Sequence, residues 1–273
     1  MPKTVHPDSP RLHNRRQREI LELVQNRGFV SSDELARTFH VTPQTVRRDI
    51  NQLCREGLLR RYHGGAGLPS TVENVAYTTR KVIRLDAKVR IARSLAAKIP
   101  DKASLFLNIG TTTEEVARAL INHKGLRVIT NNLNVAAILS QNTSFEIFVS
   151  GGVMRHRDMG ITGEATIEFI EKFKVDFGII GISGIDEDGS LMDFDYSEVR
   201  VAQAIIANSH NVFLAADSTK FGRKAMVRLS HLSQVDALFT DQRPPEGIVA
   251  ILADSNIMLH IADSSQEAEI TRR

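Results

Sequence analysis

One short segment, residues 108–113, combines the residue types that bind a phosphate group. It closes an apolar run at 104–109, precedes a helix-like pattern, and contains an amide, a glycine and three hydroxyls. Backbone N–H groups and hydroxyls at the start of a helix form a cradle for oxyanions. Lys220, and as a second candidate Arg155, could supply the positive charge that a phosphate needs. The residues expected in this site are Asn108, Gly110, Thr111, Thr112, Thr113, Arg155 and Lys220.

Several other predicted strands also end in polar residues or glycines. These residues are Asn131, Asn132, Gly151, Gly152, Gly181 and Asp217. The carboxyl ends of parallel strands meet at one edge of a sheet, where ligands bind, so we expect these residues to join the same site. The alternative for each segment is an ordinary turn between a strand and a helix, and for Gly151-Gly152 taken alone that alternative is favoured.

The elements that would position these residues alternate along the chain. Strands are expected at 104–109, 127–130, 145–149, 175–181, 212–216, 236–240 and 257–261. Helices are expected at 87–99, 113–121, 133–140, 165–172 and 198–208. This alternation predicts a parallel sheet with helices on both faces, the α/β fold class. We place this domain at 87–262, after a linker at 68–86 and before a flexible tail at 263–273.

The N-terminal part of the chain carries a surplus of positive charge. Residues 1–67 contain twelve Lys or Arg and seven Asp or Glu, a surplus of five, whereas the full chain of 273 residues has a net charge of +3. Such asymmetry is typical of a nucleic-acid-binding segment on a near-neutral body.

Three short helices are predicted within a DNA-binding domain at 11–67, after a flexible stretch at 1–10. The first contains Leu12 and ends near Gly28. The second begins at 31–34, and the third begins with Thr42 as its N-cap and is ended by Gly57. The second and third form a helix-turn-helix motif at about 31–50. On the third helix the residues expected to pack inward are Val46, Ile50 and Leu53, and those expected to point outward are Gln44, Thr45, Arg47, Arg48, Asn51 and Arg55.

A β-wing is predicted after the third helix. Leu58 and Leu59 are expected to pair as a strand before a Gly-Gly turn, and the basic residues near that turn would lie along the DNA backbone. The residues expected to contact DNA are Ser31, Thr42, Gln44, Thr45, Arg47, Arg48, Asn51, Arg60, Arg61 and His63. The alternative is a merely solvated charged face.

Other compositional features argue against a membrane, secreted or metal-binding protein. No run reaches the ~18 apolar residues of a membrane span, and residues 1–10 lack the apolar segment of a signal peptide. The single cysteine, Cys54, is expected to be a small core residue. We therefore expect a cytoplasmic protein with no metal, no cofactor and no membrane partner.

Residues 15–66 resemble the winged helix-turn-helix of the DeoR family of bacterial sugar-metabolism repressors. The matching stretches include VTPQTVRRDI at 41–50 and RYHGGA at 61–66. Residues 87–262 resemble the sensor domain of the same family, through TNNLNVA at 130–136, GITGEAT at 160–166 and KFGR at 220–223. That domain is related in fold to ribose-5-phosphate isomerase and coenzyme A transferases. One departure is Asn108, where the family usually has Asp. The amide keeps a hydrogen-bonding side chain but removes a negative charge, and this change bears on which effector the site prefers.

The resemblance implies a repressor of a carbon-metabolism operon that a small phosphorylated metabolite releases from its operator. Glycerol 3-phosphate is the effector implied first, and another sugar phosphate is the alternative. The implied partners are double-stranded operator DNA, the effector and further copies of the chain in a dimer or tetramer. DNA binding would place the protein on the nucleoid. The DNA-binding half by itself does not distinguish repression from activation, and the resemblance implies repression.

A different class, an isomerase-like enzyme with a DNA-binding arm, is the main alternative. Such an enzyme needs a carboxylate base at the reacting carbon. The candidates are Glu164, Asp193, Asp195, Glu198 and Asp217. Because Asn108 places an amide where a catalytic acid could have been, we favour a regulator and expect no enzyme activity.

Overall fold

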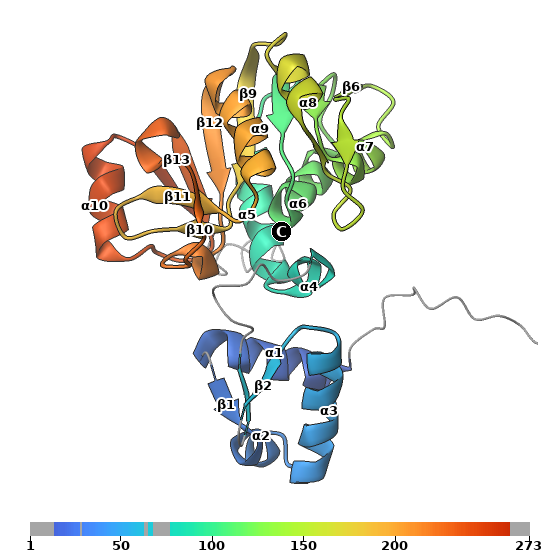
Figure 1. Ribbon diagram of the computed structural model, residues 1–273, viewed down its shortest axis with the longest axis vertical. Coiled ribbons are helices and arrows are strands. Elements are labelled where there is room, and N and C mark those ends of the chain that lie inside the picture. The colour runs from blue at the N-terminus through green and yellow to red at the C-terminus, as the bar shows by residue number, and fades with distance from the viewer. Residues whose placement is uncertain (1–13, 28, 63–64, 68–76, 263–273) are drawn as a thin grey trace, which may run out of the picture. The chain divides into compact units, whose positions relative to one another are not determined.

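The computed structural model describes residues 14–27, 29–62, 65–67 and 77–262, which belong to two compact units. One unit ends at Thr79 and the other begins at Arg80, and Figure 1 labels their elements. Several predictions fall outside the described residues: the flexible ends at 1–10 and 263–273, His63 and the first part of the linker, 68–76. No helix in the described ranges combines the length and the apolar character that crossing a membrane requires.

The N-terminal unit contains three helices and a small antiparallel sheet. The helices are α1 (Arg15–Arg27), α2 (Ser32–Thr38) and α3 (Pro43–Arg55). The strands are β1 (Phe29–Ser31), β2 (Arg60–Tyr62) and β3 (Gly65–Gly67), in the order β1-β3-β2. The Ser31 and Thr42 hydroxyls accept hydrogen bonds from backbone N–H groups in the first turns of α2 and α3, which confirms both predicted helix starts. A core that includes Ile20, Leu35 and Val46 joins the three helices.

The prediction of a strand at Leu58 and Leu59 is wrong. The N–H groups of both residues donate to the carbonyl of Leu53 at the end of α3, at 2.9 and 3.3 Å. Gly57, with φ at 72°, reverses the chain so that these bonds can form and both leucines are buried in the core. The strand β2 therefore begins at Arg60, after the two leucines.

The second unit is built on a seven-stranded, fully parallel sheet, and this confirms the predicted α/β class. Its order is β15-β14-β12-β9-β4-β5-β6. The strands are β4 (Ser104–Leu107), β5 (Arg127–Thr130), β6 (Glu146–Val149), β9 (Val175–Gly181), β12 (Ser209–Ala215), β14 (Ala237–Thr240) and β15 (Met258–Ile261). Each predicted strand is present, with ends shifted by a few residues.

Helices cover both faces of this sheet. They are α5 (Leu85–Ala96), α6 (Thr111–Leu120), α7 (Leu133–Leu139), α8 (Glu164–Ile170), α9 (Tyr196–Ala207) and α10 (Glu246–Asp254). Alternate residues of β4 belong to opposite cores: Leu105 and Leu107 pack with α5 and α6, and Phe106 packs in the core that contains α8 and α9 residues. The continuous apolar run of the strand is explained by this burial on two faces.

Several short elements were not predicted. Helix α4 (Tyr77–Val82) lies inside the segment expected to be a linker at 68–86. Strands β10 (Gly184–Ile185), β11 (Ser190–Asp193) and β13 (Val227–His231) form a second sheet, which Figure 1 shows beside α10. Strands β7 (Val153–Met154) and β8 (Ile161–Thr162) form a hairpin, and η1 (Ser218–Lys220) and η2 (Leu232–Gln234) are 3₁₀ turns. Elements this short carry too few residues to show a hydrophobic period.

Candidate functional site

Helix α3 presents one polar face and one buried face. Val46, Ile50 and Leu53 are buried, as predicted. The exposed residues are Gln44, Arg47, Arg48, Asn51 and Arg55. Amide and guanidinium groups of this kind match the donor and acceptor patterns of base edges in the major groove. The exposed face of α3 is therefore the candidate DNA-reading surface.

A buried polar cluster that sequence reasoning missed fixes α3 against α1. Asp49 is 5% exposed and accepts hydrogen bonds from Arg16 Nε at 2.7 Å and from Gln17 Nε2 at 3.0 Å. Gln17 Nε2 also donates to Gln52 Oε1 at 3.0 Å. The position of Asp49 beside Ile50, on the inward side of the helix, was the signal that could have identified it. Because a buried carboxylate needs such partners, this cluster fixes the orientation of α3.

Some of the residues predicted to contact DNA also have structural roles. Ser31 and Thr42 cap α2 and α3, and the hydroxyl of Thr45 lies 2.9 Å from that of Thr42. On the wing, Arg61 Nη1 donates to Asn51 Oδ1 at 2.7 Å, so strand β2 is tied to the reading face of α3. Arg60 is exposed.

The second unit has a small cavity at the carboxyl edge of β4 and β9, which are neighbouring strands. Of the predicted site residues, those that line it are Asn108, Gly110, Thr111, Thr112, Gly181 and Lys220. The lining residues not predicted as effector contacts include Arg80, Ser183, Asp193 and Glu198. Asp193 and Glu198 had been considered as enzyme bases, whereas Arg80 lies in the segment expected to be a linker.

The N-terminus of α6 is buried and opens on this cavity. No side chain caps it, and Gly110 precedes it with φ at 152°, a conformation that favours glycine. The Thr113 hydroxyl donates to the carbonyls of Asn108 and Gly110, both at 2.8 Å, which fixes the turn. The first-turn N–H groups of a helix have no partner within the helix, so this end is suited to an anion.

Lys220 and Arg80 line this cavity, and Arg223 and Lys88 interact with them electrostatically. Burial lowers the pKa of Lys220, and Asp217 opposes this shift. Burial, followed by repulsion from Arg80, lowers the pKa of Arg223. Behind them, burial lowers the pKa of Lys88 to about 7, although Asp217 favours its charged form. Buried cations that repel one another would be stabilised by an anionic ligand.

Some predicted site residues do not line the cavity. Thr113 holds the α6 turn, and Asp217 is a buried carboxylate that caps η1 through the Thr219 N–H at 3.0 Å. Asn132 caps α7, and Asn131 Nδ2 donates to the Ile161 carbonyl at 3.0 Å. Gly151 is exposed, and Gly152 packs against Thr166. These contacts give each residue a role in its own turn, and contact with the effector stays a prediction for them.

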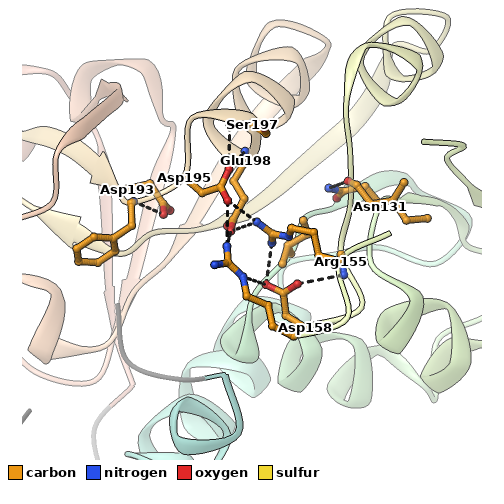
Figure 2. Close-up of polar contacts among 12 residues, drawn as sticks. Asn131, Arg155, Asp158, Asp193, Asp195, Ser197 and Glu198 are labelled. Carbon is orange, nitrogen blue, oxygen red and sulfur yellow. Dashed lines mark hydrogen bonds and ion pairs between the residues drawn. The ribbon is translucent and has the colours of Figure 1, made fainter. Parts of the chain in front are cut away.

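Arg155 is held by acidic side chains. It binds Asp158 at 2.7 Å, Asp195 at 3.0 Å and also Glu198, as Figure 2 shows. Three carboxylates already balance its charge, so a role as a phosphate counter-ion is not supported by its surroundings. Its contact with Glu198, a cavity residue, instead positions that carboxylate.

A helix-turn-helix with an exposed polar face and a second unit with an anion-suited cavity define a ligand-responsive DNA-binding regulator. The chain matches the DeoR-like helix-turn-helix domain over residues 16–72 and the DeoR C-terminal sensor domain over residues 83–242. It therefore belongs to the DeoR family of transcriptional repressors.

Individual relatives agree with this family. The chain is 51% identical to the glycerol-3-phosphate regulon repressor of Escherichia coli (strain K12), over 90% of this chain and 98% of that one. It is 44% identical to the HTH-type transcriptional repressor CsqR of the same organism, over 89% and 94%. A ribose-5-phosphate isomerase structure with phospho-erythronic acid aligns with a TM-score of 0.38 and 12% identity, covering 50% of this chain and 54% of that chain. The two named relatives are repressors, so the prediction of a regulator over an isomerase-like enzyme is confirmed.

Proposed function

We propose that the second unit binds a small phosphorylated metabolite in the cavity beside α6, and that this binding releases the repressor from its operator. The phosphate would lie between the N-terminus of α6 and the side chains of Lys220 and Arg80. The observation that carries this proposal is the buried, uncapped start of α6, which opens on a cavity lined by both cations.

The repulsion among the cations near the cavity supports a phosphate. Arg80 and Arg223 repel Lys220, and Arg80 repels Arg223, while Asp193 and Asp217 offset part of this repulsion. A bound phosphate would offset more of it.

Glycerol 3-phosphate is the effector we propose first. Relatives 51% identical to this chain are named glycerol-3-phosphate regulon repressors. A different sugar phosphate is the second candidate, because Asn108 lines the cavity where the family usually has Asp. The Asn108 side-chain oxygen accepts from the Ile109 N–H at 2.7 Å.

The cavity encloses about 40 Å³ and is partly open to solvent. Release of DNA requires the effector to bind the DNA-incompetent state more tightly, and coupling of ~1–3 kcal/mol changes operator affinity roughly 5- to 150-fold.

For DNA, we propose that α3 enters the major groove while β2 follows the backbone. The exposed residues Gln44, Arg47 and Asn51 would face base edges, and Arg60 would contact phosphate. A helix-turn-helix protein reads two half-sites as a dimer, so we propose a homo-oligomer, a dimer or tetramer, that joins the nucleoid when bound to its operator.

The test measures operator affinity at fixed salt, on a site selected from a random DNA pool, during titration with three-carbon and sugar phosphates. In the wild type, saturating effector should weaken operator binding roughly 5- to 150-fold. Lys220→Met should bind the operator normally and lose this response, because a charge-assisted contact to phosphate is removed. Lys224→Met, which removes an exposed cation from the same loop, is the control and should respond as the wild type does.

Two outcomes would contradict the assignment. Normal release by Lys220→Met would remove Lys220 from the effector site. Loss of operator binding by this variant without any ligand would show that Lys220 stabilises the fold or the oligomer instead.

A further inference from the structure

The effector cavity is lined by groups of opposite charge. The start of α6, Lys220 and Arg80 line it, and so do two carboxylates, Asp193 and Glu198. Asp193 is the last residue of β11, and Glu198 lies in the first turn of α9, so one short connection brings both to the cavity. A ligand whose phosphate is bound by the start of α6 and these cations would have its remaining groups in the cavity that the two carboxylates line.

Asp193 is fixed through one of its two oxygens. Oδ1 accepts hydrogen bonds from the Phe194 N–H at 2.6 Å and from the Ser183 hydroxyl at 3.1 Å. The residue is 8% exposed. No hydrogen bond to Oδ2 is found within the described part of the chain, so this oxygen is available to a ligand. The Asp193 side chain is thus held in place through Oδ1, and Oδ2 remains as a hydrogen-bond acceptor.

Glu198 is fixed in a similar way. Its Oε1 accepts from Arg155 and, at 3.0 Å, from Arg157, and Figure 2 shows Glu198 beside Asp195 and Arg155. Burial, and next the charge of Asp193, raise the pKa of Glu198, so the two carboxylates lie close enough to repel each other. Hydroxyl groups that donate to them would relieve this repulsion, and a third negative charge would increase it.

We propose that Asp193 and Glu198 select the effector: they accept hydrogen bonds from the hydroxyls of a short polyol phosphate and exclude phosphorylated carboxylic acids of the same size. This inference rests on the proposed phosphate site in the same cavity. Selection of this kind needs a rejected ligand as well as a favoured one. The rejected ligand is a phosphorylated acid, because its carboxylate would be placed against two carboxylates away from water. A ligand hydroxyl meets acceptor-only groups that suit it.

Glycerol 3-phosphate and 3-phosphoglycerate are a matched pair for the test, since they differ in a CH₂OH group against a carboxylate. Calorimetric titration of the full chain should show that the wild type binds glycerol 3-phosphate at least about tenfold more tightly. In Asp193→Asn the remaining amide oxygen can still accept from Phe194 and Ser183, and the new NH₂ group can donate to a ligand carboxylate. The preference should therefore fall by about 10- to 100-fold, the worth of one hydrogen bond to a charged group.

The direction in which each ligand affinity changes distinguishes effector selection from a structural role of these carboxylates. In Asp193→Asn, glycerol 3-phosphate should bind more weakly while 3-phosphoglycerate binds more tightly, and damage to the fold cannot produce this reversal. Glu198→Gln should shift the preference in the same direction. Glu164→Gln, on α8 and 70% exposed at its side chain, is the control and should leave the preference unchanged.

Equal weakening of both ligands by Asp193→Asn and Glu198→Gln would overturn the inference and assign these carboxylates to structure. An unchanged preference in both variants would overturn it as well. A wild type that binds neither phosphate would instead refute the proposed function, so the two failures are distinguishable.

Discussion

Lys88 should take up a proton when a phosphorylated effector binds. Its ammonium group lies on α5, 3% exposed, and donates to the carbonyl of Arg80. Burial lowers its pKa to about 7, so at pH 8 only about a tenth of the molecules carry the charge. Lys220 and Arg80 contribute to this shift by repulsion. A phosphate bound to those two cations would balance their charge and attract Lys88, and would therefore raise the Lys88 pKa.

The size of the effect follows from simple electrostatics. A unit charge roughly 8 Å away, at an effective dielectric constant of about 20, contributes ~2 kcal/mol, or roughly 1.5 pKa units. The Lys88 pKa in the complex would then be about 8.5. Because the complex has the higher pKa, the contribution to binding is greatest at low pH and is lost as the pH rises through about 7 to 8.5. Effector affinity should fall about tenfold between pH 7 and pH 9. The phosphate itself titrates near pH 6, outside this window.

The assay is calorimetric titration near pH 7.8 in two buffers of different ionisation enthalpy, which counts the protons taken up. The wild type should take up roughly half to three-quarters of a proton per effector. Lys88→Met should take up almost none, and Lys98→Met, which removes an exposed cation just after the end of α5, should match the wild type. If Lys88→Met took up as many protons as the wild type, the reasoning would be refuted.

Unfolding of the variant is not expected to complicate this assay. The folded-state pKa of Lys88, about 7, is below its unfolded value of 10.5, so the unfolded chain binds more protons between these values. The folded state is therefore penalised most below pH 7, by up to ~5 kcal/mol, and the penalty disappears as the pH rises toward 10.5. Lys88→Met removes this penalty and should unfold in more urea than the wild type at pH 7.

Two further predictions concern DNA. Arg47→Ala should remove specific operator binding, by about 1–3 kcal/mol or more, while the circular dichroism stays that of a folded protein, because Arg47 is exposed on the reading face of α3. Operator binding as tight as in the wild type would show that another face of the helix reads the bases. Arg61→Ala should weaken binding to operator and random DNA about equally and reduce the slope of log affinity against log salt by about 1. A loss confined to the operator would show that the Arg61–Asn51 contact takes part in base reading.

The sequence alone predicted the features that depend on residues close together in the chain. Thr42 and Pro43 mark the start of α3, and the spacing of Val46, Ile50 and Leu53 predicts its buried face, because capping and helical periodicity are local properties. The seven strands of the parallel sheet were predicted for the same reason, since each is an apolar run bounded by polar turns. The Gly110–Thr112 cradle followed from its place between a strand and a helix, and the parallel sheet then brought it to the same edge as Gly181.

The tertiary structure decided which charged groups meet. Arg155 was a candidate phosphate ligand from its type, but residues 40 and 43 positions further along, Asp195 and Glu198, bind its guanidinium. Arg80, from an unpredicted helix, lines the cavity with Asp193 and Glu198. The sequence around each residue does not predict its ion-pair partner, because the pair depends on where distant segments pack. The strength of the pair depends on the burial that this packing creates. The meeting of cations and carboxylates around one cavity is therefore a property of the folded chain.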